Sequence, residues 1–284
     1  MSNKKFILNA DDFGMSNAYN RAVLDGYNNG FLTSASICAN GEAFGPAVNE
    51  VLPECPNLGI GVHLNIIEGS SLLRNEEIPL LVNKDGKFKN GYSNFMALSL
   101  NKNFLEQAEK EFRTQIEMVM QYVVPDHIDS HVHVHAIPSI FDLTCKLAKE
   151  YGIGQVRTQY EKFYTVPKFS KHLSLKYPPN LLKIMLLNSF TKRNMNVVKE
   201  FGLKTNDYLI GVGYTGMMDD DTLYYGLNAI NDDCVAESLI HPCVFSDKNM
   251  AKNQHSVEFR ITQNQDLKDK IQRLGFEITN YKND

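Results

Sequence analysis

The sequence predicts an α/β fold with a mainly parallel sheet of seven or eight strands. Short apolar runs alternate with amphipathic helical patterns along the 284 residues, of which 43% are hydrophobic. No internal repeat, low-complexity tract or linker interrupts this alternation. Strands that alternate with helices form parallel sheets, so either a barrel or an open doubly wound sheet is expected. One domain over residues 1–284 is favoured, although the length also permits two smaller domains.

The first predicted elements form a βαβ unit. Apolar runs at residues 6–10 and 33–39 are typical of strands. Between them, Ser16 is an expected helix N-cap and Gly30 an expected helix end. The later elements alternate in the same way, with helices at 43–51, 104–122 and 138–151, and strands at 58–65, 128–134, 155–158, 208–212, 235–240 and 276–281.

Composition and targeting signals predict a folded cytoplasmic protein. The apolar runs are far shorter than the roughly 20 residues that a membrane span needs. Lys4 and Lys5 precede only three apolar residues, too few for a secretory signal. Five scattered cysteines without C-x-x-C argue against a disulfide framework and a thiolate zinc site, so reduced thiols are expected.

Positive charge is concentrated between Lys162 and Lys204. This stretch holds nine basic residues and a single acid, Glu200, so it is +8, while the formal total of -4 leaves -12 for the rest. A basic insertion or lid at about 162–204 is therefore expected. The acidic balance elsewhere and the lack of a recognised binding motif argue against a nucleic-acid partner.

Two adjacent carboxylates, Asp11 and Asp12, end the first predicted strand, in the sequence Asn-Ala-Asp-Asp-Phe-Gly. In parallel α/β folds, the carboxyl ends of strands face the active site. Adjacent side chains of an extended segment point in different directions, so one aspartate could bind a metal while the other accepts a proton. An Asx-turn that caps the next helix is an equally supported alternative.

Four of the eight histidines lie within nine residues, in the sequence His-Ile-Asp-Ser-His-Val-His-Val-His. Same-face neighbours on a strand are about 6.6 Å apart, so one metal can bind about two of them and the others must serve elsewhere. We favour a metal site over a hydrogen-bonded polar stripe or a pH-sensitive surface, because buried imidazoles are costly without a purpose. The period of two places five polar residues on one face: His127, Asp129, His131, His133 and His135.

Three further residues could complete such a site. His63 alone would be interpreted as a core residue of an apolar strand. Together with Asp11 or Asp12 and the histidine cluster, it supplies one carboxylate and two imidazoles, a donor set for metal-assisted hydrolysis. His241 could be a general acid or could pack beside a proline turn. Arg157 could hold a catalytic carboxylate ionised, although the sequence alone favours an ordinary structural ion pair.

A G-x-G-x-x-G pattern follows the strand predicted at 208–212 and ends at Gly216. Three aspartates at 219–221 crowd the start of the next helix, where a pyrophosphate would bind. A dinucleotide site is therefore not expected.

Three motifs together resemble those of the YdjC-like carbohydrate deacetylases: NADDFG at 9–14, GVHL at 61–64 and DSHVHVH at 129–135. The resemblance runs from about residue 5 to the C-terminus, with the motifs in the family's order and spacing. It implies a TIM-like irregular (β/α) barrel that hydrolyses the N-acetyl group of amino sugars with one divalent metal. The family implies magnesium, whereas two imidazoles are more typical of zinc, manganese or iron.

The same resemblance implies roles for individual residues. Asp11 would be the base that takes a proton from the attacking water, with Arg157 as its orienting arginine. His241 would be the acid, with His133 as an alternative. The three metal ligands would be Asp12, His63 and His131.

The expected substrate is an acetylated oligosaccharide or, because of the basic stretch, a sugar phosphate steered by positive charge. The oligomeric state stays open, a homodimer included. One competing function is another metal-dependent barrel hydrolase, either an amidohydrolase or a phosphoesterase. Such enzymes usually open with a His-x-His strand, where this chain has two aspartates. A non-catalytic sugar-binding protein is the second alternative.

Overall fold

The computed structural model describes residues 3–167, 172 and 174–283, and places eight strands in one sheet. The strand order is β5-β4-β3-β2-β1-β7-β6, β8 pairs with β1, and every pairing is parallel. The strand bounds are β1 Lys4–Phe13, β2 Ser34–Ile37, β3 Gly59–Leu64, β4 His127–Ser130, β5 Gln155–Val156, β6 Tyr208–Ile210, β7 Cys234–Ile240 and β8 Phe276–Thr279.

Hydrogen bonds between the segments 154–160 and 204–209 link the two edges of the sheet. The Val156 amide donates to the Lys204 carbonyl at 3.1 Å, and the Leu209 amide donates to the Tyr160 carbonyl at 2.8 Å. The sheet therefore curls into an irregular barrel and is not an open doubly wound sheet. The fold class predicted from the sequence, a TIM-like irregular (β/α) barrel of mainly parallel strands, is confirmed.

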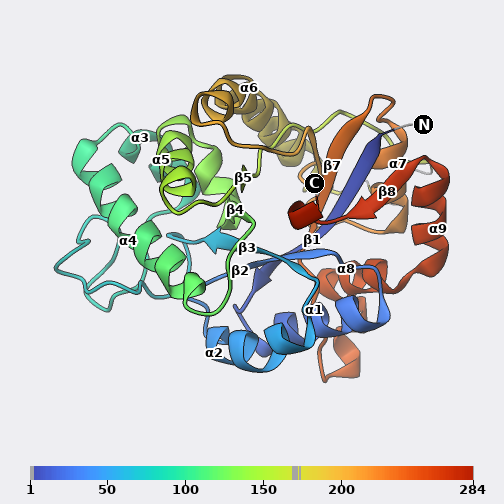
Figure 1. The fold of residues 1–284 in the computed structure, drawn as a ribbon, viewed down its shortest axis with the longest axis horizontal. Coiled ribbons are helices and arrows are strands. Elements are labelled where there is room, and N and C mark those ends of the chain that lie inside the picture. The colour runs from blue at the N-terminus through green and yellow to red at the C-terminus, as the bar shows by residue number, and fades with distance from the viewer. Residues whose placement is uncertain (1–2, 168–171, 173, 284) are drawn as a thin grey trace.

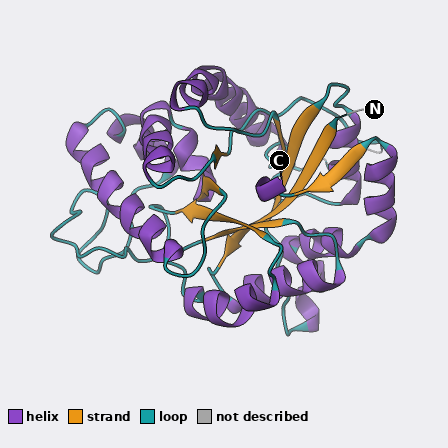
Figure 2. Ribbon diagram, viewed as in Figure 1, coloured by secondary structure: helices purple, strands orange, loops and turns teal. Residues whose placement is uncertain are grey.

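Helices surround the strands and connect one parallel strand to the next (Figures 1 and 2). Local sequence sets several of their ends: the Asn101 side chain caps α4, and Gly202 ends α6 in the left-handed conformation that favours glycine. The helix bounds are α1 Asn17–Asn29, α2 Phe44–Pro46, α3 Tyr92–Leu98, α4 Lys102–Met120, α5 Pro138–Glu150, α6 Tyr177–Phe201, α7 Asp220–Asn228, α8 Gln254–Gln263 and α9 Gln265–Arg273.

The last described turn, Tyr281–Asn283, lies among the strands (Figure 1). The Tyr281 ring is buried and stacks on His127, with 4.0 Å between ring centroids. Gln155 donates to the Tyr281 carbonyl at 2.7 Å. His127 and Gln155 begin β4 and β5, so this C-terminal segment covers the amino ends of the strands and leaves their carboxyl ends for the functional site.

The strand predicted at 128–134 is wrong in its second half. β4 ends at Ser130, and a short helical turn covers His131–Ala136. Val132 and His133 have φ of 54° and 58°, in the left-handed region, so the chain turns across the end of the sheet. The five polar residues of this motif consequently do not share one face.

The basic stretch 162–204 falls on the connection between β5 and β6, which includes α6. Its residues 168–171 and 173 lie outside the described part of the chain. Among the described helices, none combines the length and the apolar character needed to cross a membrane.

Candidate metal centre and active site

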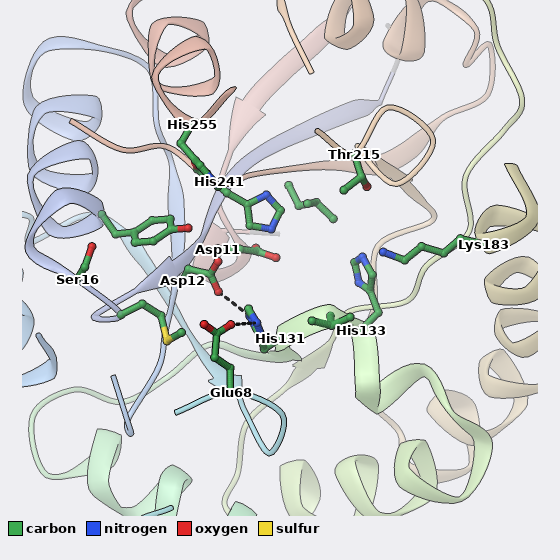
Figure 3. Close-up of a pocket in the computed structure, with 14 residues that line it drawn as sticks. Asp11, Asp12, Ser16, Glu68, His131, His133, Lys183, Thr215, His241 and His255 are labelled. Carbon is green, nitrogen blue, oxygen red and sulfur yellow. Dashed lines mark hydrogen bonds and ion pairs between the residues drawn. The ribbon is translucent and has the colours of Figure 1, made fainter. Parts of the chain in front are cut away.

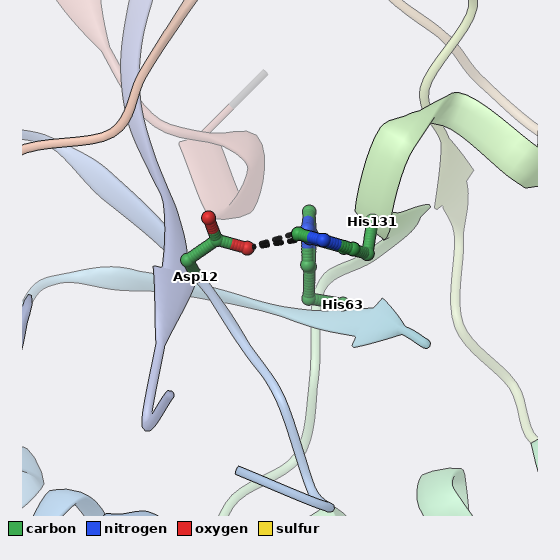
Figure 4. Close-up of side chains that lie close together, drawn as sticks. All are labelled: Asp12, His63 and His131. Carbon is green, nitrogen blue, oxygen red and sulfur yellow. Dashed lines mark hydrogen bonds and ion pairs between the residues drawn. The ribbon is translucent and has the colours of Figure 1, made fainter. Parts of the chain in front are cut away.

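Three side chains from distant parts of the sequence meet at the carboxyl ends of β1, β3 and β4 (Figure 4). Asp12 Oδ1 lies 3.3 Å from His63 Nε2 and 2.8 Å from His131 Nδ1. One potential ligand atom from each residue lies within 4.8 Å of those of the other two. The structure thus brings together the three metal ligands expected from the sequence.

The chemistry of these residues fits a divalent metal. One carboxylate and two imidazoles are a donor set of catalytic metal sites, which keep further positions open for water and substrate. Imidazole ligands favour zinc, manganese or iron over magnesium. Among the described residues, the non-glycine residues with positive φ are Asp12, Val132 and His133, so backbone strain is concentrated beside this site.

The His63 ring is oriented by a buried carboxylate. His63 Nδ1 lies 2.7 Å from Asp129 Oδ1, which directs Nε2 toward Asp12. Burial disfavours the charged ring, but Asp129 and Asp12 outweigh it and raise the pKa of His63 to about 10. A metal must therefore displace a proton from this ring when it binds.

Arg157 is fully buried and joins the candidate base to this network. Its Nη1 and Nη2 donate to the two carboxylate oxygens of Asp11, at 2.8 and 2.7 Å. Nη2 also lies 2.7 Å from Asp129, and Nε donates to Glu237 at 2.9 Å. A second close group of potential ligands consists of Asp11, His63 and Asp129. Both carboxylates of this group already form ion pairs with Arg157. The Asp12 group is therefore the better candidate metal site.

A cavity of about 510 Å³ opens over these residues (Figure 3). Its lining includes the two aspartates Asp11 and Asp12 and the three histidines His131, His133 and His241. The five residues come from the ends of β1, β4 and β7, so the cavity lies where the parallel strands end. The cavity therefore exposes both predicted proton-transfer residues, Asp11 and His241, together with two of the three candidate metal ligands, Asp12 and His131.

The two histidines predicted as alternative acids differ in charge. Burial lowers the pKa of His241, but the Glu258 carboxylate and then Asp12 outweigh it and raise that pKa to about 9. For His133, burial and then the nearby Lys183 hold the pKa well below 6.5. At neutral pH His241 therefore carries a proton that it can donate, whereas His133 is neutral.

The other histidines of the motif are structural. His127 Nε2 lies 3.1 Å from the Ser36 hydroxyl, and its ring stacks on Tyr281. His135 Nε2 lies 3.0 Å from the Arg157 carbonyl, and burial lowers the pKa of His135 to about 4. These contacts agree with the prediction that some histidines of the motif are not metal ligands.

The glycine-rich segment 211–216 binds a side chain of the same protein. The Glu161 carboxylate accepts hydrogen bonds from the amides of Val212 and Gly213, at 2.9 and 3.0 Å. These amides would be needed to bind a dinucleotide phosphate, so the segment is not such a site.

Glu258, Lys183 and Glu68 contact or line the site and were not predicted from the sequence. Glu258 lies on α8 and Lys183 on α6, far along the chain from the metal-ligand motifs. Lys183 belongs to the basic stretch, but no local pattern distinguishes it from the other lysines there.

Comparison with known proteins agrees with the geometry. The family model described as YdjC-like protein matches residues 5–273. A carbohydrate deacetylase of Clostridium beijerinckii is 33% identical over 197 residues, which are 68% of this chain and 77% of that protein. A carbohydrate deacetylase of Brevibacillus brevis is 37% identical over 150 residues, which are 52% of this chain and 57% of that protein.

A solved structure covers almost the whole chain. It is a protein of Enterococcus faecalis V583, provisionally named a cellobiose-phosphate cleavage protein, with 25% sequence identity and a TM-score of 0.76 over 99% of each chain. The family match spans nearly the full sequence and includes all three motifs of the site. The chain therefore belongs to the YdjC-like protein family.

Proposed function

We propose that the protein is a metal-dependent deacetylase that hydrolyses the N-acetyl group of an acetylated amino sugar or oligosaccharide. The observation that carries this proposal is the convergence of Asp12, His63 and His131 at the floor of a cavity that Asp11, Asp12 and His131 line. The relatives named carbohydrate deacetylase support it independently.

Asp12, His63 and His131 would hold one divalent metal, with zinc, manganese or iron favoured by the two imidazoles. Such a metal supplies Lewis acidity, which lowers the pKa of water and stabilises negative charge on a carbonyl oxygen.

The remaining residues handle two protons. Water that attacks the acetyl carbonyl must lose a proton, and Asp11 would accept it; the position of Asp11 in the cavity lining supports this role. Arg157 holds the Asp11 carboxylate in position by donating a hydrogen bond to each of its oxygens. The sugar amine must gain a proton as its bond to the acetyl carbon breaks, and His241, which also lines the cavity, would donate it. Glu258 keeps His241 protonated for this step.

The test is acetate release from a panel of N-acetylglucosamine oligomers by the zinc- or manganese-loaded protein. We expect release by the wild type, loss in Asp11→Asn, and little change in Glu42→Gln, a control at an exposed carboxylate. A non-catalytic sugar-binding protein would bind the oligomers without releasing acetate, and that result would reject the proposal.

One observation favours a sugar phosphate as the substrate. Lys183 extends from α6 toward His133 and lines the cavity (Figure 3). Burial lowers the pKa of Lys183, an effect that Glu161 only partly opposes. Within the described part of the chain, Lys183 has no ion-pair partner. A substrate anion would compensate the burial of this cation.

A comparison of phosphorylated and unphosphorylated sugars tests this choice. We expect Lys183→Met to lower kcat/KM for the phosphate about tenfold or more while sparing the neutral sugar. Lys192→Met, at an exposed position of the same helix, should affect neither. Equal losses for both sugars in Lys183→Met would reject the phosphate contact.

A further inference from the structure

We propose that Glu68 is a positioning residue, which holds His131 so that its Nδ1 faces the metal. The inference rests on the metal site of the proposed function and adds a residue that orients one of its ligands. Glu68 lies in the loop that follows β3, and its carboxylate reaches back to His131 (Figure 3).

Each histidine of the candidate site has one ring nitrogen near Asp12 and the other near a second carboxylate. For His63 these are Nε2, 3.3 Å from Asp12, and Nδ1, 2.7 Å from Asp129. For His131 they are Nδ1, 2.8 Å from Asp12, and Nε2, 3.2 Å from Glu68. A ligating imidazole donates its other N–H to such a partner, which fixes its tautomer and orientation. The geometry therefore assigns ligation to Nε2 of His63 and to Nδ1 of His131.

The loop that carries Glu68 is folded around a buried asparagine. Asn65 Oδ1 accepts from the backbone amides of Ile67 and Glu68, at 3.0 and 3.1 Å. Asn65 Nδ2 donates to the Glu68 carbonyl at 2.8 Å. Three hydrogen bonds to one fully buried side chain hold the backbone of Glu68 in place.

Two buried polar residues of α4 hold this loop by hydrogen bonds to its backbone. Gln115 accepts from the Asn65 amide at 2.9 Å and donates to the Asn65 carbonyl at 2.7 Å. Glu111 accepts from the amides of Leu72 and Leu73, at 3.0 and 3.1 Å. Neither Gln115 nor Glu111 reaches the cavity, and both side chains are completely buried. Their hydrogen bonds compensate that burial and fix the loop above the metal site.

Solvent limits the strength of the contact between Glu68 and His131. The Glu68 side chain is 65% exposed, so its interaction with the ring is screened. It also borders a second cavity of about 470 Å³, which is lined by Asn40, Glu42 and Ser70. We therefore expect Glu68 to tune metal binding without contributing to the stability of the fold.

The experiment compares zinc affinity in the wild type, Glu68→Ala, Glu68→Gln and the control Glu42→Gln, by competition with a chromophoric chelator at pH 7. Loss of such an outer partner costs about 10- to 100-fold in metal affinity. We expect the lower end of this range for Glu68→Ala, because solvent screens the contact. Glu68→Gln should lose less, because its amide oxygen still accepts from Nε2. The control should stay within about twofold of the wild type, because Glu42 is exposed and belongs to neither close group of candidate ligands among the described residues.

NMR of the ¹⁵N-histidine-labelled, zinc-loaded protein adds a readout of tautomer. We expect zinc at Nδ1 of His131 and at Nε2 of His63. The proposal is overturned if zinc binds His131 through Nε2, or if Glu68→Ala binds zinc as tightly as Glu42→Gln does. Complete loss of zinc in both Glu68 variants would make Glu68 a ligand and would also overturn it. A wild type that binds no zinc would instead reject the metal site itself.

Discussion

Arg157 donates to both carboxylate oxygens of Asp11, at 2.8 and 2.7 Å, from a fully buried position inside the barrel. The same guanidinium contacts Asp129, which orients His63, so one cation connects the candidate base to a candidate metal ligand. Removal of this cation would leave several buried carboxylates without a partner, which is costly in a low-dielectric interior.

Arg157→Met should therefore lower the free energy of unfolding by about 3–5 kcal/mol. Arg193→Met is the matched control, because Arg193 pairs with Asp142 at the surface, where an ion pair contributes about 0–1 kcal/mol. Urea denaturation of the three proteins measures both values. Equal losses in the two variants would show that the Arg157 network is not the buried support described here.

Substitution of Asp11 should lower kcat, whereas substitution of Asp12 should lower zinc affinity, although the two residues are adjacent in the sequence. Asp11→Asn should keep zinc affinity and lose about 10²- to 10⁴-fold in kcat, as expected for loss of a general base. Asp12→Asn should lose zinc affinity, because it removes a candidate ligand. Calorimetric zinc titration and acetate release distinguish the two. Retention of zinc by Asp12→Asn would remove Asp12 from the metal site.

The pH dependence of kcat/KM should reflect the protonation of His241. A general acid must be protonated, and the pKa of His241 is raised to about 9, so kcat/KM should fall as the pH rises through about 9. Glu258→Gln removes the carboxylate that favours the protonated ring, so the alkaline limb should move to lower pH. Glu42→Gln should leave the limb in place. An alkaline limb that does not respond to Glu258→Gln would contradict this role for His241.

Gly61 has a steric reason to be glycine. A Cβ at this position would meet the buried His127 ring at 2.3 Å. Gly61→Ala should therefore lower the free energy of unfolding by about 1–3 kcal/mol through overpacking. Gly45→Ala is the control, since nothing lies within 4 Å of the added Cβ. A Gly61→Ala protein as stable as the control would show that the His127 ring moves aside without cost.

Local patterns were sufficient to predict the alternation of strands and helices. They also placed Asp12 and His63 at strand ends, because parallel strands bring their carboxyl ends to one rim. The prediction of an extended strand with alternating faces was wrong after Ser130. There Val132 and His133 adopt left-handed backbone conformations that no local residue type demands.

Glu68 and Glu258 could not be found from the sequence, because their functional contacts are tertiary. Glu68 lies 63 residues before His131, and Glu258 lies 17 residues after His241. Each is an ordinary carboxylate in its own segment, and only the folded barrel places it beside an imidazole. Arg157 shows the same limit, since the residues around it give no indication of which carboxylates it pairs with, and only the family resemblance linked it to Asp11.

The most direct test of the account is anomalous diffraction from crystals grown with zinc or manganese. We expect one strong peak at about 2.0–2.2 Å from Asp12 Oδ1, His63 Nε2 and His131 Nδ1. A metal found elsewhere in the barrel, or no peak under conditions in which acetate is released, would contradict it.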